Sequence, residues 1–318
     1  MTSRVVNDPS RRNRYFVSTN GSFPTSIWYP AVAEPGKLPV RFEDEMLVRD
    51  PYWSAPLVDR ALSAVAHALP DARCATKGAS YPVVLYSPGW NGDRTSVIVE
   101  LAENLASQGY IVVSMDHFDS RGVIFPDGTF LVGDISAAGF ALPGFLDRVR
   151  DVELVLDEMV RWNADDPVLA GRMDLTKVAG MGWSWGGGVV GEVCRVDNRV
   201  RAVILLDAYL QNADDLVRLG LQKPLLGMYS TEAGGDSTLY NKATRDAIYF
   251  IISPSYHVFF SSLYWWFYPG SSDLINGREA ARTIDAYTVW FLNKYLMGST
   301  DPMPALKDYR HVINFQQK

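Results

Sequence analysis

Ser184 is the residue whose setting in this sequence best suits covalent chemistry. It lies in the segment Gly182-Trp183-Ser184-Trp185-Gly186, which follows an apolar run and precedes a Gly-rich stretch that can form a helix. A Gly-x-Ser-x-Gly pattern is weak by itself, but a strand before it and a helix after it are the context of a nucleophile elbow. Glycines permit the close backbone approach that such a turn needs, and the helix N-terminus directs N–H groups at a developing oxyanion. We interpret Ser184 as a nucleophile; a glycine-rich turn that only packs a helix closely is the alternative.

A serine nucleophile needs a base, and the sequence contains four histidines. In folds with this elbow the order along the chain is serine, acid, histidine. His67 and His117 precede the serine, and His311 lies beyond the last long helical segment, near the C-terminal end. His257 follows an apolar strand and precedes that last helix. His257 is therefore the predicted base.

Two carboxylates compete for the role of the orienting acid. Asp207 ends the apolar run 201–207, and Glu232 follows the next apolar run, a place where many hydrolases have their acid. An aspartate at the end of so apolar a segment is costly to bury unless it is paired. We favour Asp207 for this reason, and Glu232 remains open.

The segments that must position these residues alternate between predicted strands and predicted helices. Apolar runs that indicate strands occur at 82–87, 110–115, 177–182, 201–207, 224–230 and 247–252, and helical spacing occurs at 94–109, 147–162 and 277–298. Apolar strands that alternate with helices predict an α/β fold with a mostly parallel central sheet and helices on both faces.

The remaining segments are expected to be peripheral to one domain spanning 13–318. Residues 1–12 are polar and expected to be flexible, and a hairpin is expected around Asn20-Gly21. Residues 31–80, with a helical stretch at 56–69, are expected to run over the surface. The insert 118–145 follows a strand end, where α/β ligand sites form, so we expect it to be a lid.

The composition of the chain argues against some classes of binding partner. A net charge of −6 and a pI near 5.3 argue against a nucleic-acid-binding protein, which needs a basic face. The sequence has no signal-peptide pattern and no run of 18 apolar residues, so we expect no stable membrane insertion and a cytoplasmic location. Cys74 and Cys194 are expected to be buried free thiols. The oligomeric state is left open.

A set of motifs resembles the platelet-activating-factor acetylhydrolase family. The motifs YSPGWNG, MDHFDS, DRVRDVELVLDEM, GMGWSWGGG, LLDAYL and SYHVFF occur in the order found in that family, between about residues 82 and 297. The resemblance implies an α/β-hydrolase fold and a triad of Ser184, Asp207 and His257. It also implies an oxyanion hole formed by the backbone N–H groups of Trp90 and Trp185.

Two departures from the family's pattern bear on the pocket. Pro88-Gly89 stands where the family usually has His-Gly, and tryptophans flank Ser184 and follow Gly89. These large side chains predict a narrow acyl pocket. We expect Trp183, Phe118 and Phe259 to contact the substrate. The aromatic run 258–270 either lines the pocket or packs in the core and lid.

The predicted activity is hydrolysis of a carboxylic ester with a short acyl or acetyl group, through an acyl-enzyme on Ser184. The alcohol of that ester is lipid-like or aromatic. The substrate is a small molecule, and no metal or other cofactor is expected. Two alternatives stay open. One is an enzyme of a biosynthetic pathway that performs acyl transfer, lactone opening or a cyclisation, and the other is a ligand-binding protein with a silent triad.

Overall fold

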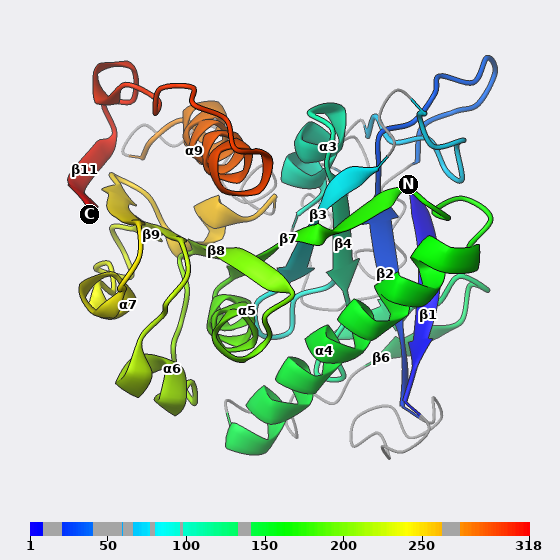
Figure 1. Ribbon diagram of the computed structural model, residues 1–318, viewed down its shortest axis with the longest axis horizontal. Coiled ribbons are helices and arrows are strands. Elements are labelled where there is room, and N and C mark those ends of the chain that lie inside the picture. The colour runs from blue at the N-terminus through cyan, green and yellow to red at the C-terminus, as the bar shows by residue number, and fades with distance from the viewer. Residues whose placement is uncertain are drawn as a thin grey trace. The chain divides into compact units, whose positions relative to one another are not determined.

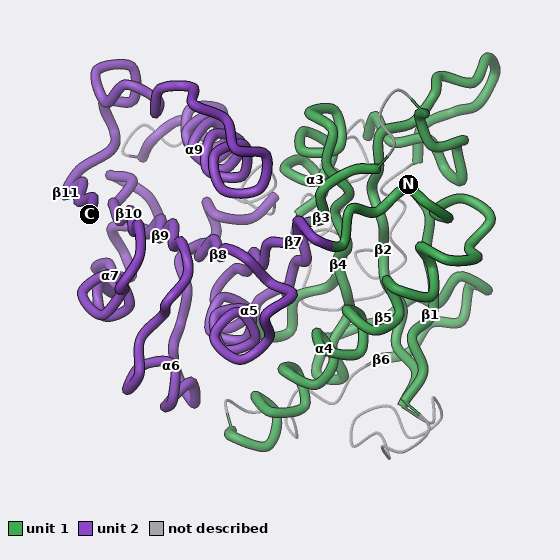
Figure 2. Tube along the Cα trace, viewed as in Figure 1, with its two compact units in different colours: residues 1–83, 90–175 green, residues 84–89, 176–318 purple. Residues whose placement is uncertain are grey.

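A computed structural model represents the 318-residue protein. The structure describes residues 1–8, 21–40, 59, 66–76, 80–95, 98–132, 141–262 and 274–318. The chain divides into two compact units, which Figure 2 shows in separate colours. Unit 1 consists of Met1–Val83 and Trp90–Leu175, and unit 2 consists of Val84–Gly89 and Thr176–Lys318. The chain passes between the units within strand β3 (Tyr81–Ser87), after Gly89, and within strand β7 (Met173–Trp183).

Unit 1 contains an antiparallel set of strands. β2 (Ser22–Trp28) pairs on one side with β1 (Thr2–Asn7) and on the other with β4 (Ile111–Met115). The two long helices of the unit are α3 (Val99–Ser107) and α4 (Leu142–Asp165). Figure 1 shows α3 and α4 on opposite sides of these strands, so both faces of this part of the sheet are covered.

Unit 2 contains the parallel strands. From Thr176 on, β7 pairs with β8 (Val200–Leu206), and the next neighbours are β9 (Leu225–Ser230) and β10 (Ala247–Ile252), all parallel. An antiparallel strand, β11 (Val312–Gln317), pairs with β10. Helices α5 (Trp185–Val196) and α9 (Gly277–Met297) lie on opposite sides of β8 in Figure 1. The predicted α/β architecture, parallel strands with helices on both faces, is therefore confirmed.

The apolar runs of the sequence become buried strands. Every residue of β9 and β10 is buried, and in β8 only Arg201 is exposed. Strands covered on both faces carry apolar side chains throughout, which explains why these runs do not alternate with polar residues. The ends of helix α9 also follow from sequence: Asn276 caps the first turn by accepting from the Arg278 N–H, and Gly298 ends the helix in a left-handed conformation.

Two short helices complete unit 2 between its parallel strands. α6 (Asp214–Leu219) follows β8, and α7 (Thr238–Lys242) follows β9. Short 3-10 turns occur at η2 (His257–Phe260) and η3 (Leu306–Asp308). The first of these turns carries the predicted base.

The expectation of a flexible N-terminus is wrong for the residues that the structure describes there. Thr2–Asn7 form strand β1, which is hydrogen-bonded along the whole of β2. The Arg4 guanidinium forms two hydrogen bonds with Asp166, at 2.5 and 2.9 Å. An edge strand is ordered by backbone pairing with its neighbour. The mostly polar side chains of β1 therefore gave little indication of a strand in the sequence. Residues 9–12 lie outside the described residues.

The predicted insert at 118–145 contains secondary structure of its own. β5 (Gly122–Ile124) and β6 (Phe130–Val132) form a small antiparallel sheet closed by a turn, in which the Gly128 N–H donates to the Phe125 carbonyl. Residues 133–140 lie outside the described residues, and α4 already begins at Leu142. A lid role for this segment stays a prediction.

Other peripheral expectations fall partly outside the described residues. These are the first strand of the hairpin near Asn20, most of the helical stretch at 56–69, and residues 263–270 of the aromatic run. The single-domain organisation stays a prediction. Cys74 and Cys194 are buried free thiols, as expected.

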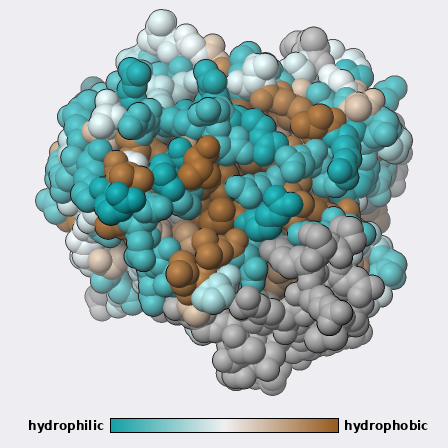
Figure 3. All heavy atoms as spheres, turned by 60° about the horizontal axis from the view of Figure 1, so that its bottom comes forward, coloured by the Kyte–Doolittle hydropathy of each residue, from teal (hydrophilic) through white to brown (hydrophobic). Residues whose placement is uncertain are grey.

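The surface mixes polar and apolar side chains. The face shown in Figure 3 carries groups of apolar side chains between polar ones. Exposed large apolar residues of the described chain include Leu142, Leu146, Tyr209 and Tyr256. Among the described residues, no helix combines the length and the apolar character needed to cross a membrane.

Candidate active site

Ser184 lies in a sharp turn between strand β7 and helix α5. Its backbone has φ 58° and ψ −131°, a conformation that non-glycine residues rarely adopt. The Ser184 N–H donates to the Leu206 carbonyl at 3.0 Å, and the Ser184 carbonyl accepts from the Gly187 and Tyr209 N–H groups. These bonds hold the strained turn in place, and strain of this kind is concentrated at functional sites.

The glycines around Ser184 are required by close backbone contacts. A Cβ atom on Gly182 would lie 2.3 Å from the Gly186 carbonyl oxygen, and one on Gly186 would lie 2.1 Å from the Ser87 carbonyl oxygen. A Cβ on Gly187 would lie 2.4 Å from the Cβ of Ala208. All three distances are far below van der Waals contact. The Gly-rich turn therefore has the crowding that a nucleophile elbow imposes.

Asp207 and His257 are joined by a short hydrogen bond. Asp207 follows β8 directly, is fully buried, and its Oδ2 lies 2.7 Å from the Nδ1 of His257. Its other oxygen, Oδ1, accepts from the Ser230 N–H at 2.7 Å. A carboxylate oxygen accepts, so Nδ1 of His257 donates to Asp207, and in the neutral imidazole this tautomer leaves the lone pair on Nε2. This is the tautomer that a histidine base needs.

Glu232, the alternative acid, contacts a different part of the same histidine. Its Oε2 accepts from the backbone N–H of His257 at 2.7 Å. Asp207 holds the ring of His257, and Glu232 holds its backbone. The two carboxylates thus contact different parts of His257, and Asp207 is the one that contacts the imidazole; its role as the acid of a triad stays a prediction.

Two aromatic rings stack on the imidazole of His257. The Tyr209 ring lies 4.8 Å away at an interplanar angle of 2°, and the Trp183 ring lies 4.9 Å away at 25°. Both residues are linked to Ser184: Trp183 precedes it in the chain, and the Tyr209 N–H donates to its carbonyl at 2.9 Å. The indole Nε1–H of Trp183 also donates to the His257 carbonyl, at 3.1 Å. These contacts bring His257 to the elbow.

Tyr209 is a component that the sequence did not single out. It lies two residues after Asp207, in the motif LLDAYL, and is partly exposed. Partial burial, with the negative charges of Asp207 and Glu232, raises the pKa of its phenol above the usual value. The phenol therefore stays neutral at physiological pH. Its position two residues after the predicted acid was the one signal that could have revealed it.

The other predicted site residues lie in different surroundings. Trp185 is fully buried, and its indole N–H donates to the Gln211 carbonyl at 2.9 Å. Phe259 is buried in the turn after His257 and packs edge-on against Tyr256. Trp90 and Phe118 belong to unit 1, where Phe118 is buried against Phe23 at a ring distance of 5.7 Å. The predicted roles of Trp90 and Phe118 stay predictions.

Polar residues that follow β4 contact buried polar partners in unit 1. Asp116 pairs with Arg94, which donates to it from both its backbone and its guanidinium. His117 Nδ1 lies 2.8 Å from Asp151, and both side chains are fully buried. These contacts give Asp116 and His117 structural roles in unit 1, each with a partner of its own.

Comparison with known proteins finds a family model and several proteins that are similar to this chain. A family model described as "Platelet-activating factor acetylhydrolase, isoform II" matches residues 51–125. A protein of Arthroderma benhamiae, named "Probable 1-alkyl-2-acetylglycerophosphocholine esterase", is 30% identical over 148 residues, which is 44% of this chain and 34% of that protein. The platelet-activating factor acetylhydrolase of Cavia porcellus is 25% identical over 267 residues, covering 71% of this chain and 56% of that one.

The chain is similar in part of its length to members of the platelet-activating factor acetylhydrolase family. The resemblance drawn from the motifs is thereby confirmed. The chain spans 34% and 56% of the length of these two curated relatives. Among solved structures, a ferulic acid esterase from Streptomyces cinnamoneus superposes with a TM-score of 0.81 over 98% of this chain and 94% of that one, at 23% identity. This likeness confirms the α/β-hydrolase fold.

The crowding at the elbow predicts that alanine substitutions at two glycines of helix α5 differ sharply in their effect on stability. Gly186→Ala places a Cβ against backbone carbonyls, whereas Gly191→Ala places it against the end of the flexible Leu216 side chain. We expect Gly186→Ala to lower the free energy of unfolding by about 3 kcal/mol or more. Gly191→Ala is expected to change it by less than about 1 kcal/mol, because the helix gains propensity from alanine. Urea denaturation of both variants measures the difference, and equal stabilities would contradict the crowding.

Proposed function

We propose that this protein is a serine hydrolase of carboxylic esters, with Ser184, Asp207 and His257 as its catalytic triad. The observation that carries the proposal is the 2.7 Å hydrogen bond between Asp207 and His257 beside a strained serine turn. The relationship to acetylhydrolases supports the same reaction class.

In the proposed reaction, the Oγ of Ser184 attacks the ester carbonyl while the Nε2 of His257 accepts its proton. Asp207 stays ionised, fixes the imidazole tautomer, and stabilises the imidazolium that forms. The imidazolium then donates the proton to the leaving alcohol, and an acyl-enzyme remains on Ser184. Water, activated by the same histidine, releases the acid and restores the serine.

The tetrahedral intermediate needs donors for its oxyanion. The backbone N–H of Trp185 lies at the first position of α5, at the N-terminus of that helix, and is proposed as one donor. The N–H of Trp90 is proposed as the second donor, by the family resemblance. Loss of one such donor costs about 10²–10³ in rate, so the loop at Gly89-Trp90 is expected to contribute substantially to the reaction.

A short acyl group fits the crowding beside the serine. A Cβ on Gly89 would lie 2.9 Å from the Ser184 Cβ and 3.0 Å from the Trp183 ring, so the backbone of Gly89 packs directly on the serine. Ser184 itself is only 5% exposed. The relatives' names refer to acetyl groups, which agrees with an acetyl ester as substrate. With a lipid-like alcohol, the reaction would belong to lipid degradation; aromatic alcohols are the second class to test.

Replacing the nucleophile tests the proposal directly. We expect Ser184→Ala to abolish release of acetate from p-nitrophenyl acetate, with a loss of about 10⁴-fold or more in kcat, because no acyl-enzyme can form. The wild type is expected to prefer acetyl over octanoyl esters. Circular dichroism and thermal unfolding of the variant serve as the folding control. Undiminished hydrolysis by a folded Ser184→Ala protein would refute the assignment.

The two carboxylates near His257 provide a matched pair of variants. Asp207→Asn removes the charge that fixes the ring, and we expect a loss of about 10⁴-fold in kcat. Glu232→Gln keeps a carbonyl oxygen that can accept from the His257 N–H, so we expect less than a tenfold loss. Steady-state kinetics on one acetyl ester compares the two. A larger loss in Glu232→Gln would identify Glu232 as the acid.

A further inference from the structure

The imidazole of His257 is contacted by a carboxylate at one edge and by aromatic rings that stack on it. Asp207 lies 2.7 Å from Nδ1, and the ring centroids of Tyr209 and Trp183 lie 4.8 and 4.9 Å from that of the imidazole. The Tyr209 ring is parallel to the imidazole within 2°. Trp183 is buried, and the His257 side chain is 21% exposed. The stacked rings therefore take the place of water that would otherwise cover the imidazole.

The loss of this water matters most for the charged form of the imidazole. In the proposed reaction Nε2 accepts the proton of the Ser184 hydroxyl, and the ring becomes a cation. Removing water from a cation is unfavourable unless other groups stabilise the charge. The face of an aromatic ring carries a negative electrostatic potential and attracts a cation within about 6 Å of its centroid. Both stacked rings lie within this distance, and their attraction is stronger for the imidazolium than for the neutral imidazole.

The charged and titratable groups that face His257 come from two loops of unit 2. They are Asp207 at the ring, Glu232 at the backbone N–H, and the phenol of Tyr209. Strand β9 and helix α9 also pack against the turn η2, and the buried residues of both elements are uncharged. A substitution that keeps the shape of the ring at position 209 therefore changes the stacking and leaves both carboxylates in place.

We propose that the aromatic faces of Tyr209 and Trp183 stabilise the His257 imidazolium, which makes Tyr209 a positioning residue that acts through the base. This inference rests on the proposed function, because it gives the stacking a role in the step that protonates His257. Rings that bind the imidazolium more strongly than the neutral imidazole lower the energy of the transition state relative to the resting enzyme. A role in packing alone would depend on the volume of the Tyr209 side chain and not on the charge distribution of its ring.

Three side chains at position 209 separate these two roles. Tyr209→Phe keeps the aromatic face, and Tyr209→Leu removes it. Pentafluorophenylalanine, inserted at position 209 by stop-codon suppression, keeps nearly the same shape and reverses the sign of the potential on the face. We expect Tyr209→Phe to retain kcat on p-nitrophenyl acetate within about twofold, and the other two proteins to lose about three- to tenfold in kcat with KM unchanged.

The pH profile of kcat/KM provides a second readout of the same three proteins. An imidazolium that is stabilised less releases its proton at lower pH. We therefore expect the acid limb of the profile to move to lower pH by about 0.5 to 1 unit in the leucine and pentafluorophenylalanine proteins.

Tyr256 offers a matched control position. It is also exposed, it precedes His257 in the chain, and its ring packs edge-on against Phe259. Tyr256→Phe and pentafluorophenylalanine at position 256 are expected to change neither kcat nor the acid limb.

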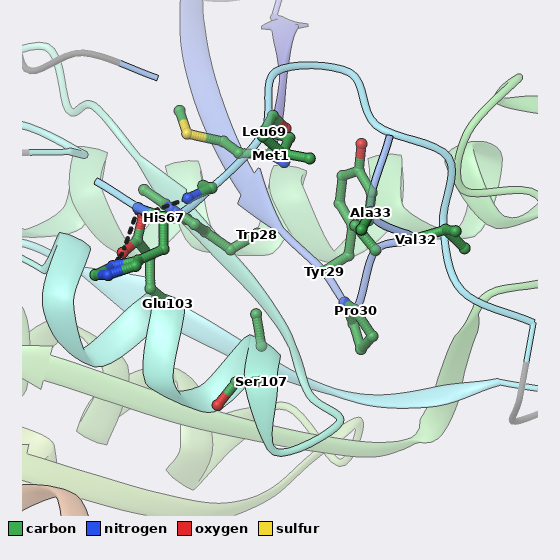
Figure 4. Close-up of a pocket in the computed structure, with 13 residues that line it drawn as sticks. Met1, Trp28, Tyr29, Pro30, Val32, Ala33, His67, Leu69, Glu103 and Ser107 are labelled. Carbon is green, nitrogen blue, oxygen red and sulfur yellow. Dashed lines mark hydrogen bonds and ion pairs between the residues drawn. The ribbon is translucent and has the colours of Figure 1, made fainter. Parts of the chain in front are cut away.

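A titration followed by NMR tests the inference without any substrate. A ¹⁵N-histidine-labelled protein contains four imidazoles, and His257→Ala identifies the signals of His257. His67 is the internal reference. It also faces a carboxylate, Glu103 at 3.1 Å, in the wall of a cavity of about 380 Å³ in unit 1 (Figure 4), and its side chain is 83% exposed. We expect the midpoint of the His257 titration to be lower with leucine or pentafluorophenylalanine at position 209 than in Tyr209→Phe, and that of His67 to be the same in all three proteins.

The outcomes distinguish this inference from the proposed function. Equal His257 midpoints in the three proteins overturn the role of the stacking, and so do equal losses of kcat for pentafluorophenylalanine at positions 209 and 256. If the wild type releases no acetate, the proposed function fails, and the NMR midpoints alone decide whether the rings stabilise the imidazolium. If Tyr209→Leu does not fold, as judged by circular dichroism, the comparison of phenylalanine with pentafluorophenylalanine decides.

Discussion

Two neighbouring strands of unit 2 end in residues with positive φ, Ser184 at 58° and Asp207 at 46°. Each is tied to the next strand by its own backbone: the Ser184 N–H donates to Leu206, and the Asp207 N–H donates to Met228. Because the strands are parallel and adjacent, these two turns lie at the same edge of the sheet. The backbone conformation at the two strand ends therefore fixes where the hydroxyl and the carboxylate are presented.

The histidine reaches this edge from a different element. Its turn follows β10. Asp207 holds its ring nitrogen, Glu232 holds its backbone N–H, and the Trp183 indole N–H donates to its carbonyl. The rings of Trp183 and Tyr209 also stack on its imidazole. Because these contacts already fix the orientation of the His257 ring, aligning this ring with Ser184 costs little conformational entropy. Trp183, one of the two tryptophans beside the serine, thus has a structural role here, since its ring packs against His257.

The central part of this arrangement could be predicted from sequence. Apolar runs identified the parallel strands, and the elbow motif identified the turn at Ser184, because burial on both faces and backbone crowding leave strong patterns in composition. The edge strands could not be identified in this way. In β11 the side chains are mostly exposed, and in β1 the sequence is mostly polar, so both depend on backbone pairing, which any sequence can make. Stacking of Tyr209 on His257 was likewise unpredictable, since it arises from tertiary approach and not from spacing.

Labelling with a fluorophosphonate, followed by intact mass and peptide mapping, tests the central claim that Ser184 is an activated nucleophile. The account predicts one adduct per chain, located on Ser184, and its formation at a greatly reduced rate in His257→Ala. Absence of an adduct under conditions that label a control esterase, or an adduct on another residue, would contradict it.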